Sequence, residues 1–177
     1  MREEDAAPLA VLNADPAVMR HFPAPLSRAE SDAFLARMMR HEGDHGFGFR
    51  AVEGHDGAFI GLCGLARVGF AARFAPAVEI GWRLAPPFWG KGLAAEAARL
   101  ALGWGFGPLG LTEIVSFTVP ANAPSWRLMQ RLGMRPDGVF DHPRLPEGHP
   151  LRRHLLYRLA HADWAAQARP SGALGRG

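Results

Sequence analysis

The sequence predicts a mixed α/β domain, of the α+β kind, with one sheet and helices packed against it. Three observations predict this class. Apolar residues repeat at helical spacing in the first third of the chain, they alternate at strand spacing in the next part, and a strand–helix–strand crossover lies in the middle. The 177 residues contain no internal repeat and no linker. Because chains usually divide only beyond ~250–300 residues, one domain is expected.

Two helices are expected at the start of the chain. The apolar residues of segment 6–14 lead to the Asp-Pro pair at 15–16, where a helix should stop. Ser27 and Glu30 have the spacing of a capping box, and apolar residues then follow at helical spacing. A second helix is therefore expected over residues 28–42.

Three strands should follow these helices. Residues 47–53 alternate between apolar and other side chains, residues 54–57 (Gly-His-Asp-Gly) are typical of a turn, and residues 58–66 form a second apolar run. The two runs should pair as an antiparallel hairpin. After a loop at 68–76, residues 78–84 have the pattern of a third strand, which a Pro-Pro pair ends.

The second half of the chain should contain a helix, a strand, a helix and two strands. Segment 92–106 has only two charged side chains, so this helix should be apolar nearly all round and buried against the sheet. Residues 114–119 form a β-branched strand. Asn122 is expected to cap the next helix, with Gly133 at its C-terminal end. The last two strands are expected over residues 135–140 and 151–159.

Composition disfavours several classes of protein. The sequence pI is 9.9, but the net charge is only +3, and Lys91 is the only lysine among 20 basic residues. The arginines are spread among acids and form no dense basic stripe, which argues against nucleic-acid binding. No apolar run approaches ~18 residues and the first five residues carry acids, so neither a membrane span nor a secretory signal is expected. A cytoplasmic protein is expected. The single cysteine, Cys63, excludes a disulfide framework and a CxxC metal site.

Residues 88–92 (Phe-Trp-Gly-Lys-Gly) join the third strand to the buried helix. Gly90 and Gly92 lack side chains, so backbone amides can approach a ligand, and the start of the helix adds the positive end of its dipole. A pyrophosphate would fit such a loop, with Lys91 adding charge or projecting into water. The spacing is neither that of a Walker A loop nor GxGxxG. A tight strand–helix turn explains the glycines equally well.

A second pattern, N-x-x-S-x6-L-G-M, comes directly after the strand at 114–119. It consists of Asn122, Ser125, Leu132, Gly133 and Met134. Alone, it describes a capped amphipathic helix. Together with the strand EIGWRL and the loop WGKG, it closely resembles the GNAT superfamily of acyl-CoA-dependent N-acetyltransferases. Within that superfamily it is similar to the branch of ribosomal-protein N-terminal alanine acetyltransferases. The resemblance covers roughly residues 5–164.

The resemblance implies a mostly antiparallel sheet that splays after the strand at 78–84 to hold acetyl-CoA. The acetyl group would pass directly to a primary amine, either a protein N-terminus or a small amine, without a covalent enzyme intermediate. Cys63 is then not needed as a nucleophile and is expected in the core. No metal is implied. The partners would be acetyl-CoA and the amine acceptor, with neither nucleic acid nor membrane, and a homodimer is one option.

The same resemblance assigns roles to single residues. The backbone edge of Trp82, Arg83 and Leu84 would pair with the pantetheine arm, and an amide there would polarise the thioester carbonyl. Asn122 and Ser125 would line the pantetheine and thiol end. Six residues would hold the CoA pyrophosphate with their amides: Trp89, Gly90, Lys91, Gly92, Leu93 and Ala94.

Such chemistry needs a base, because only the neutral amine attacks the thioester. Glu79 is the first candidate, since a carboxylate on an apolar strand is costly unless it is paired or faces a cleft. A salt bridge with Arg83 on the same face of the strand is the alternative and stays open. Ser125 is a candidate for relaying a proton or for protonating the leaving thiolate.

The chain departs from the family pattern in several places. Pro87 occupies the Gln/Arg position of the loop, and Met129 stands where many relatives carry a general-acid tyrosine, while the only tyrosine, Tyr157, lies in the last strand. A non-catalytic acyl-CoA-binding or sensory module is therefore the alternative function.

The chain also starts at its first helix, whereas the family usually begins with a strand. The domain is expected over residues 1–168, one strand short, with a disordered tail at 169–177.

Two groups of histidines could suggest metal sites. His41 and His45 have the i,i+4 spacing of a zinc pair, but neighbouring glycines indicate that the helix is ending, which favours a solvated polar loop. The second group lies in the loop before the last strand, and it lines the acceptor pocket, binds a metal or is plain loop structure. This group consists of Asp141, His142, Glu147, His149 and His154.

Overall fold

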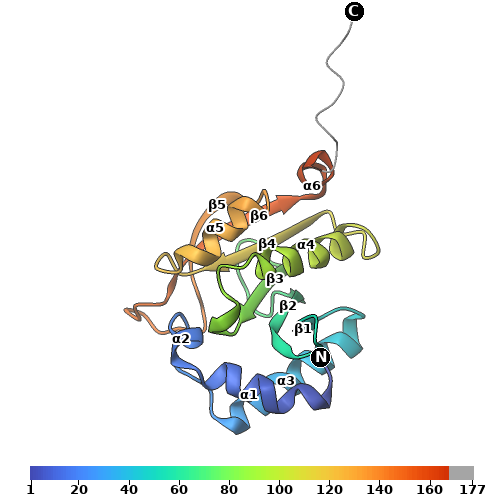
Figure 1. The fold of residues 1–177 in the computed structure, drawn as a ribbon. Helices are drawn as coiled ribbons and strands as arrows, with labels where there is room; N and C mark the ends of the chain where they lie inside the picture. The colour runs from blue at the N-terminus through green and yellow to red at the C-terminus, as the bar shows by residue number, and fades with distance from the viewer. Residues whose placement is uncertain (168–177) are drawn as a thin grey trace, which may run out of the picture.

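A six-stranded sheet in the order β1-β2-β3-β4-β6-β5 forms the middle of the structure (Figure 1). The structure is a computed structural model that describes residues 1–167, so the tail expected at 169–177 lies outside the described residues. Every strand pairing is antiparallel except that of β3 with β4. The strands are β1 (Phe49–Glu53), β2 (Phe59–Arg67), β3 (Val78–Leu84), β4 (Glu113–Thr118), β5 (Arg135–Asp141) and β6 (Arg153–Ala160).

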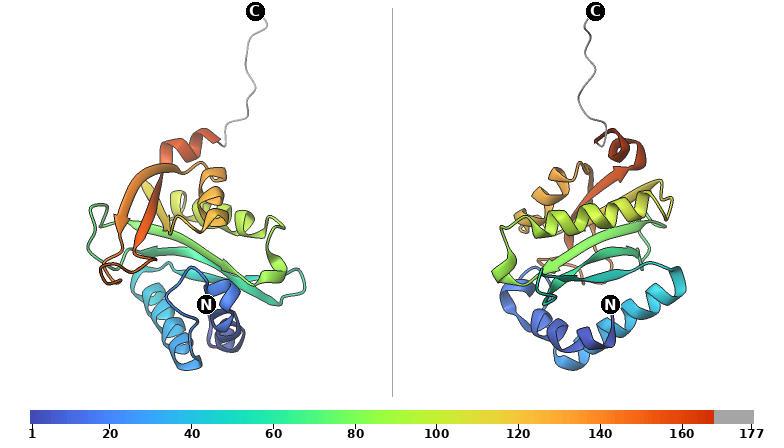
Figure 2. Two further views of the ribbon diagram at one scale, coloured as in Figure 1. Left: turned by 90° about the vertical axis from the view of Figure 1, so that its left-hand side faces the viewer. Right: turned by 45° about the vertical axis from the view of Figure 1, so that its right-hand side comes forward.

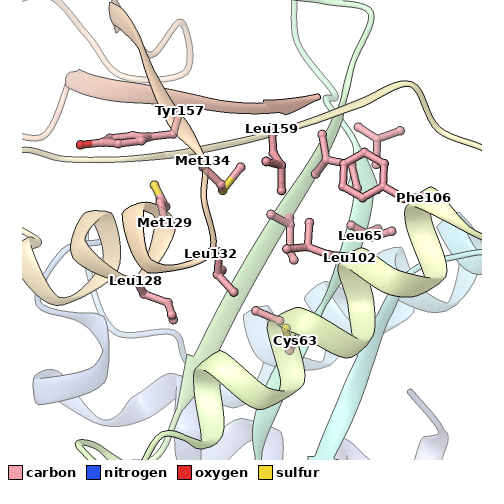
Figure 3. Close-up of a cluster of buried hydrophobic side chains, with 14 of the residues drawn as sticks. Cys63, Leu65, Leu102, Phe106, Leu128, Met129, Leu132, Met134, Tyr157 and Leu159 are labelled. Atoms are coloured by element: carbon pink, nitrogen blue, oxygen red, sulfur yellow. The ribbon is translucent and has the colours of Figure 1, made fainter. Parts of the chain in front are cut away.

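Helices cover both faces of the sheet (Figure 2). The helices α1 to α3 pack on one face, around buried side chains such as Leu9, Leu35 and Leu62. The helices α4 and α5 pack on the other face, where the largest core cluster lies (Figure 3). The helices are α1 (Ala6–Ala14), α2 (Pro16–Met19), α3 (Arg28–His45), α4 (Leu93–Phe106), α5 (Ala123–Arg131) and α6 (His161–Gln167), with 3-10 turns η1 (Glu3–Asp5) and η2 (Pro86–Phe88). The predicted fold class is confirmed.

The expected elements are present, but three expectations about helices were wrong. Helix α3 does not end at residue 42 but continues to His45, where Gly46 adopts a positive φ of 75° and ends it. Two short helices, α2 and α6, were not expected. Helix α4 is not buried all round, because it covers the sheet with one face only, and Leu100 and Trp104 on its other side are 73% and 49% exposed.

The sheet divides between β3 and β4, as expected. The two strands are in register at a single pair, Glu79 with Val115, and the Ser116 hydroxyl donates a hydrogen bond to the Ile80 carbonyl at 2.9 Å. Beyond that point β3 continues from Gly81 to Leu84 paired with β2 alone. The backbone groups that this end of β3 turns toward β4 are therefore left without a strand partner.

Among the described residues, β1 is an edge strand of the sheet, with no further strand beyond it. Nor does any helix within residues 1–167 combine the length and apolar character needed to cross a membrane. The same residues hold no group of three or more His, Cys, Asp or Glu side chains that could bind a metal ion.

Strands β1 and β2 approach each other closely at Gly64. A Cβ atom at this residue would lie 2.4 Å from the Gly48 carbonyl oxygen and 2.6 Å from Phe49 Cα. Backbone atoms cannot give way as a flexible side chain can, so the strands would have to move apart.

We expect Gly64→Ala to lower the free energy of unfolding by about 2–3 kcal/mol, measured by urea denaturation. Gly103→Ala is the matched control. Gly103 lies in α4 with open space where a Cβ would stand, so alanine there should stabilise the helix by up to about 1 kcal/mol. Equal effects of the two substitutions would contradict the close approach of β1 and β2.

Candidate active site

The loop before α4 offers unpaired backbone amides. Gly90 and Gly92 have φ values of 71° and 84°, which only glycine adopts freely, and no atom lies within 4 Å of where a Cβ would be. The amides of Gly90, Lys91, Gly92, Leu93 and Ala94 donate no hydrogen bond within the described residues. The first amides of a helix have no intrahelical acceptor and lie at the positive end of its dipole. This loop can therefore bind an anion.

Trp89 differs from the other predicted loop donors. Its amide is not free but donates to the Pro86 carbonyl at 3.1 Å, because the 3-10 turn η2 closes there. Its indole Nε1 donates to the Leu84 carbonyl at 2.6 Å, which ties the loop to the end of β3. The only lysine, Lys91, is exposed and lies 5.7 Å from the ring centre of Phe88.

Asn122 lies at the end of β4, beside the start of α5. It occupies the N-cap position of α5, as predicted, but its side chain makes no capping hydrogen bond to the helix. Instead, Nδ2 donates to Thr118 Oγ1 at 3.0 Å. The Ser125 hydroxyl makes no hydrogen bond within the described residues and is half-buried. Since β3 and β4 run parallel, their carboxyl ends lie at the same edge of the sheet. The amide-rich loop and the segment 122–125 therefore flank the split together.

Glu79 is the acidic side chain at the split. It lies on β3 opposite Val115, is partly buried, and forms no ion pair within the described residues. Burial raises its pKa to about 7, and the positive charge of Arg144 limits the rise. A carboxyl group with such a pKa can gain or lose a proton near neutral pH.

The alternative salt bridge between Glu79 and Arg83 does not form. The Arg83 guanidinium instead donates through Nη1 to Asn13 Oδ1 of α1. It also lies 4.3 Å from the ring centre of Phe22 and 5.5 Å from that of Phe34. The two side chains share a face of β3, but their contacts come from different parts of the molecule.

Comparison with known proteins adds the family. The sequence model described as an acetyltransferase (GNAT) domain matches residues 1–135. The chain belongs to the GNAT acetyltransferase family. It is 36% identical over 86 residues to the uncharacterized N-acetyltransferase YnaD of Bacillus subtilis (strain 168), an alignment that covers 49% of this chain and 50% of YnaD. The chain thus aligns with only half the length of that relative.

Solved structures share the fold of this GNAT domain at low sequence identity. Spermidine N-acetyltransferase from Vibrio cholerae, in complex with CoA and spermine, has a TM-score of 0.74 and 20% identity, and covers 93% of this chain and 95% of its own. Ribosomal-protein-S5-alanine acetyltransferase from Vibrio fischeri has a TM-score of 0.69 and 19% identity. That match covers 93% of this chain and 92% of the Vibrio fischeri chain. The alanine acetyltransferase branch is thus one of several neighbours.

An aromatic cluster lies on the Glu79 face of this GNAT domain. Phe117 stands two residues beyond Val115 on β4, and its ring centre lies 5.4 Å from that of Phe140 on β5. His142 and His154 pack into the same cluster, 5.1 Å apart. Burial, His154 and Arg144 lower the pKa of His142 to about 4, so its imidazole is neutral at neutral pH. These side chains form an uncharged wall beside the split.

His41 has a structural role, and the expected solvated loop was wrong because both His41 and His45 lie in α3. Arg67 donates its backbone N–H to His41 Nε2 at 2.9 Å, and His41 Nδ1 lies 2.9 Å from the Phe47 carbonyl. Because Nε2 accepts, Nδ1 carries the proton and donates. His41 therefore joins the end of α3 to the segment before β1 and to β2.

Two departures from the family pattern lie in the core (Figure 3). Met129 is 1% exposed, and Tyr157 is 5% exposed with its hydroxyl accepting from Gln130 Nε2 at 3.2 Å. Met129 has no proton to donate, and the Tyr157 hydroxyl lies in the core beside Gln130. Cys63 is likewise buried, and burial raises its pKa to about 12, consistent with its expected core position.

A cavity of about 1100 Å³ lies between β1, β2 and the exposed side of α4, and Glu79 is not among its lining residues. Phe88 and Lys91 line it near the loop before α4. Its other walls are mainly apolar, including Val52, Leu100 and Trp104.

Sequence reasoning missed Arg144 and Phe117, which the fold brings to Glu79 and to the split. Arg144 is exposed, donates through Nη2 to the Gly69 carbonyl at 2.7 Å and lies over Phe70. The loop that carries it could be assigned to the acceptor region, but nothing in its sequence spacing indicates which β3 residue it faces.

We expect Arg144→Met to raise the pKa of Glu79 above its value near 7, because removing a nearby cation makes the carboxylate less favourable. A ¹³C NMR titration measures this, with the Glu79 signal assigned by its loss in Glu79→Gln. Arg73→Met is the control, since Arg73 pairs with Asp137 and does not affect Glu79. An unchanged or lower pKa in Arg144→Met would contradict the assignment.

Proposed function

We propose that the chain is an acetyl-CoA-dependent N-acetyltransferase that transfers the acetyl group to a primary amine by direct attack on the thioester. The observation that carries the proposal is the juxtaposition of five free loop amides with the split between β3 and β4. A diphosphate needs several aligned N–H donors, and an extended amide-containing arm needs an unpaired strand edge. Family membership supports the same activity.

The residues present fit CoA as the acyl donor. Gly90 and Gly92 keep the loop free of side chains, so the amides of residues 90–94 can contact both phosphates. Pro87 offers no side-chain donor, which leaves the backbone as the source of these contacts. The end of β3 from Trp82 to Leu84 can pair with the two amides of the pantetheine arm. Asn122 and Ser125 lie across the split, where the thiol end would be.

The side chains can also carry the proton transfers. Glu79 takes the proton from the acceptor ammonium, and the neutral amine then attacks the thioester carbonyl carbon. A backbone amide at the end of β3 stabilises the resulting oxyanion. When the C–S bond breaks, the thiolate takes a proton from the Ser125 hydroxyl or from water. The acetylated nitrogen gives its extra proton to the alkoxide or hydroxide left behind, which yields the neutral amide and free CoA thiol.

The acceptor is a protein N-terminus or a small amine. Two structural neighbours differ in this respect: by their titles, one is a spermidine N-acetyltransferase and the other a ribosomal-protein-S5-alanine acetyltransferase. We also retain the expectations of a cytoplasmic location, of a homodimer as an option, and of no nucleic-acid or membrane partner. Low-salt retention on DNA or RNA would contradict the third of these.

A non-catalytic acyl-CoA-binding module is the second candidate. The burial of Met129 at the position of the general acid favours it. The two candidates differ in turnover. Release of free thiol from acetyl-CoA should rise on adding a panel of primary amines, whereas tight CoA binding without turnover for any amine would support the binding module instead.

We expect Gly92→Ala to weaken CoA binding about tenfold, measured by isothermal titration calorimetry. Alanine at a φ of 84° is strained by roughly 1–2 kcal/mol, so the loop should change shape and lose amide contacts. Gly103→Ala, further along the same helix in an open position, should bind CoA like the unmodified protein. Equal affinities of the two variants would argue against the loop as the diphosphate site.

We expect Glu79→Gln to reduce kcat/KM for the amine by roughly 10²–10⁴-fold, the usual contribution of a general base. A base acts only when deprotonated, so the unmodified enzyme should gain activity as pH rises through an apparent pKa near 7. This rising limb should disappear in the variant, while CoA affinity stays the same. If the limb persists in Glu79→Gln, another group is the base.

A further inference from the structure

Arg83 is a half-buried cation without an anionic partner. Its guanidinium makes one hydrogen bond within the described residues, from Nη1 to Asn13 Oδ1, and its Nε is fully buried with no partner. No carboxylate of the described residues lies within ion-pair distance of it. Burial lowers its pKa to about 10, which still leaves it charged at neutral pH.

Such a side chain is costly for the folded protein. Removing a cation from water without a carboxylate partner destabilises the fold, and the two aromatic faces of Phe22 and Phe34 recover only part of that cost. The Nη2 atom also makes no hydrogen bond, and unlike Nε it is not fully buried. Arg83 thus keeps a charged donor that a ligand can reach.

The position of Arg83 is tied to the split. It lies on the part of β3 that has left β4, and its side chain points to the α1–α3 face, as its contacts with Asn13 and Phe34 show. Glu79 stands four residues earlier on the same face, about 13 Å away along the strand. Gly81, between them, adds no side chain. The other face of β3 carries Trp82, which packs toward the α4 core.

Two further cations lie near this face of β3. Arg144 acts on Glu79, and the Arg20 guanidinium lies 5.8 Å from the Trp89 ring centre. Several acids of the neighbouring elements are already engaged in caps or ion pairs. These are Asp15 with the Ala17 amide, Glu30 with Ser27, Asp32 with Arg28, Asp137 with Arg158, and Asp141 with Arg152.

We propose that the Arg83 guanidinium binds a carboxylate of the acceptor, and that the acceptor is a primary amine carrying a carboxylate group instead of a polyamine. This inference rests on the proposed acetyl transfer and adds the acceptor class to it. Guanidinium is suited to this task because its planar N–H groups match a carboxylate. A polyamine, in contrast, would bring several positive charges close to the unpaired Arg83 and offer it no anion.

Matched amine pairs test the proposal directly. Lysine is compared with cadaverine, 4-aminobutyrate with butylamine, and spermidine serves as the polyamine, with thiol release from acetyl-CoA as the assay. We expect kcat/KM to be roughly tenfold or more higher for the carboxylated member of a pair. No turnover with any amine despite CoA binding overturns the proposed function itself. Equal turnover of both members, or a preference for spermidine, overturns only the acceptor class.

Variants of Arg83 assign the preference to this side chain. In Arg83→Met the ratio of kcat/KM between paired amines should approach one, mainly through a higher KM for the carboxylated amine. Arg83→Lys should keep part of the preference for the carboxylated amine, because the positive charge remains but the paired N–H donors of the guanidinium are lost. Arg37→Met is the matched control, since Arg37 lies 5.7 Å from the ring centre of the same Phe34 but belongs to α3.

The readout separates binding from folding. A merely structural Arg83 would lower the rates for both members of a pair alike and leave their ratio intact, which would overturn the assignment. Thermal unfolding and CoA affinity are measured for each variant. If Arg83→Met does not fold, the ratio in Arg83→Lys and the wild-type preference decide between the two roles.

Discussion

The single parallel pairing of this sheet determines where everything else lies. Glu79 opposite Val115, with the Ser116 hydroxyl bound to the Ile80 carbonyl, holds β3 and β4 together at one point and lets them part beyond it. Parallel strands bring both carboxyl ends to one edge, so the loop before α4 and the segment after β4 converge there. An open strand edge next to free helix amides follows from the same pairing.

Much of this fold is predictable from the sequence because its signals are local. The capping box of Ser27 and Glu30 forms as expected, and β3 has the predicted bounds. Helix α2 was missed because the Asp-Pro pair that ends α1 also starts a new helix, with Asp15 accepting from the Ala17 amide. Helix α6 depends on a distant contact, the stacking of Trp164 on Phe106, which no local pattern reveals.

The site is predictable in part, and the division again follows the range of the interactions. The loop glycines could be recognised because positive φ values and missing side chains are properties of single residues. The protonation behaviour of Glu79 could not be predicted from the sequence, because its pKa depends on burial and on Arg144 from a distant loop. The same holds for Arg83, whose alternative partner on its own strand, Glu79, is replaced by Asn13 and Phe22 from the N-terminal helices and the segment after them.

The unpaired arginine and the base do different work on one face of β3. Burial raises the pKa of Glu79, and the cation that limits this rise is Arg144 from a distant loop. The Arg83 guanidinium is held instead by Asn13 and Phe22. An acceptor carboxylate bound to Arg83 would therefore position the acceptor, while the proton affinity of Glu79 would still be set by its burial and by Arg144. Acceptor recognition and base strength are then separate properties of the same strand face.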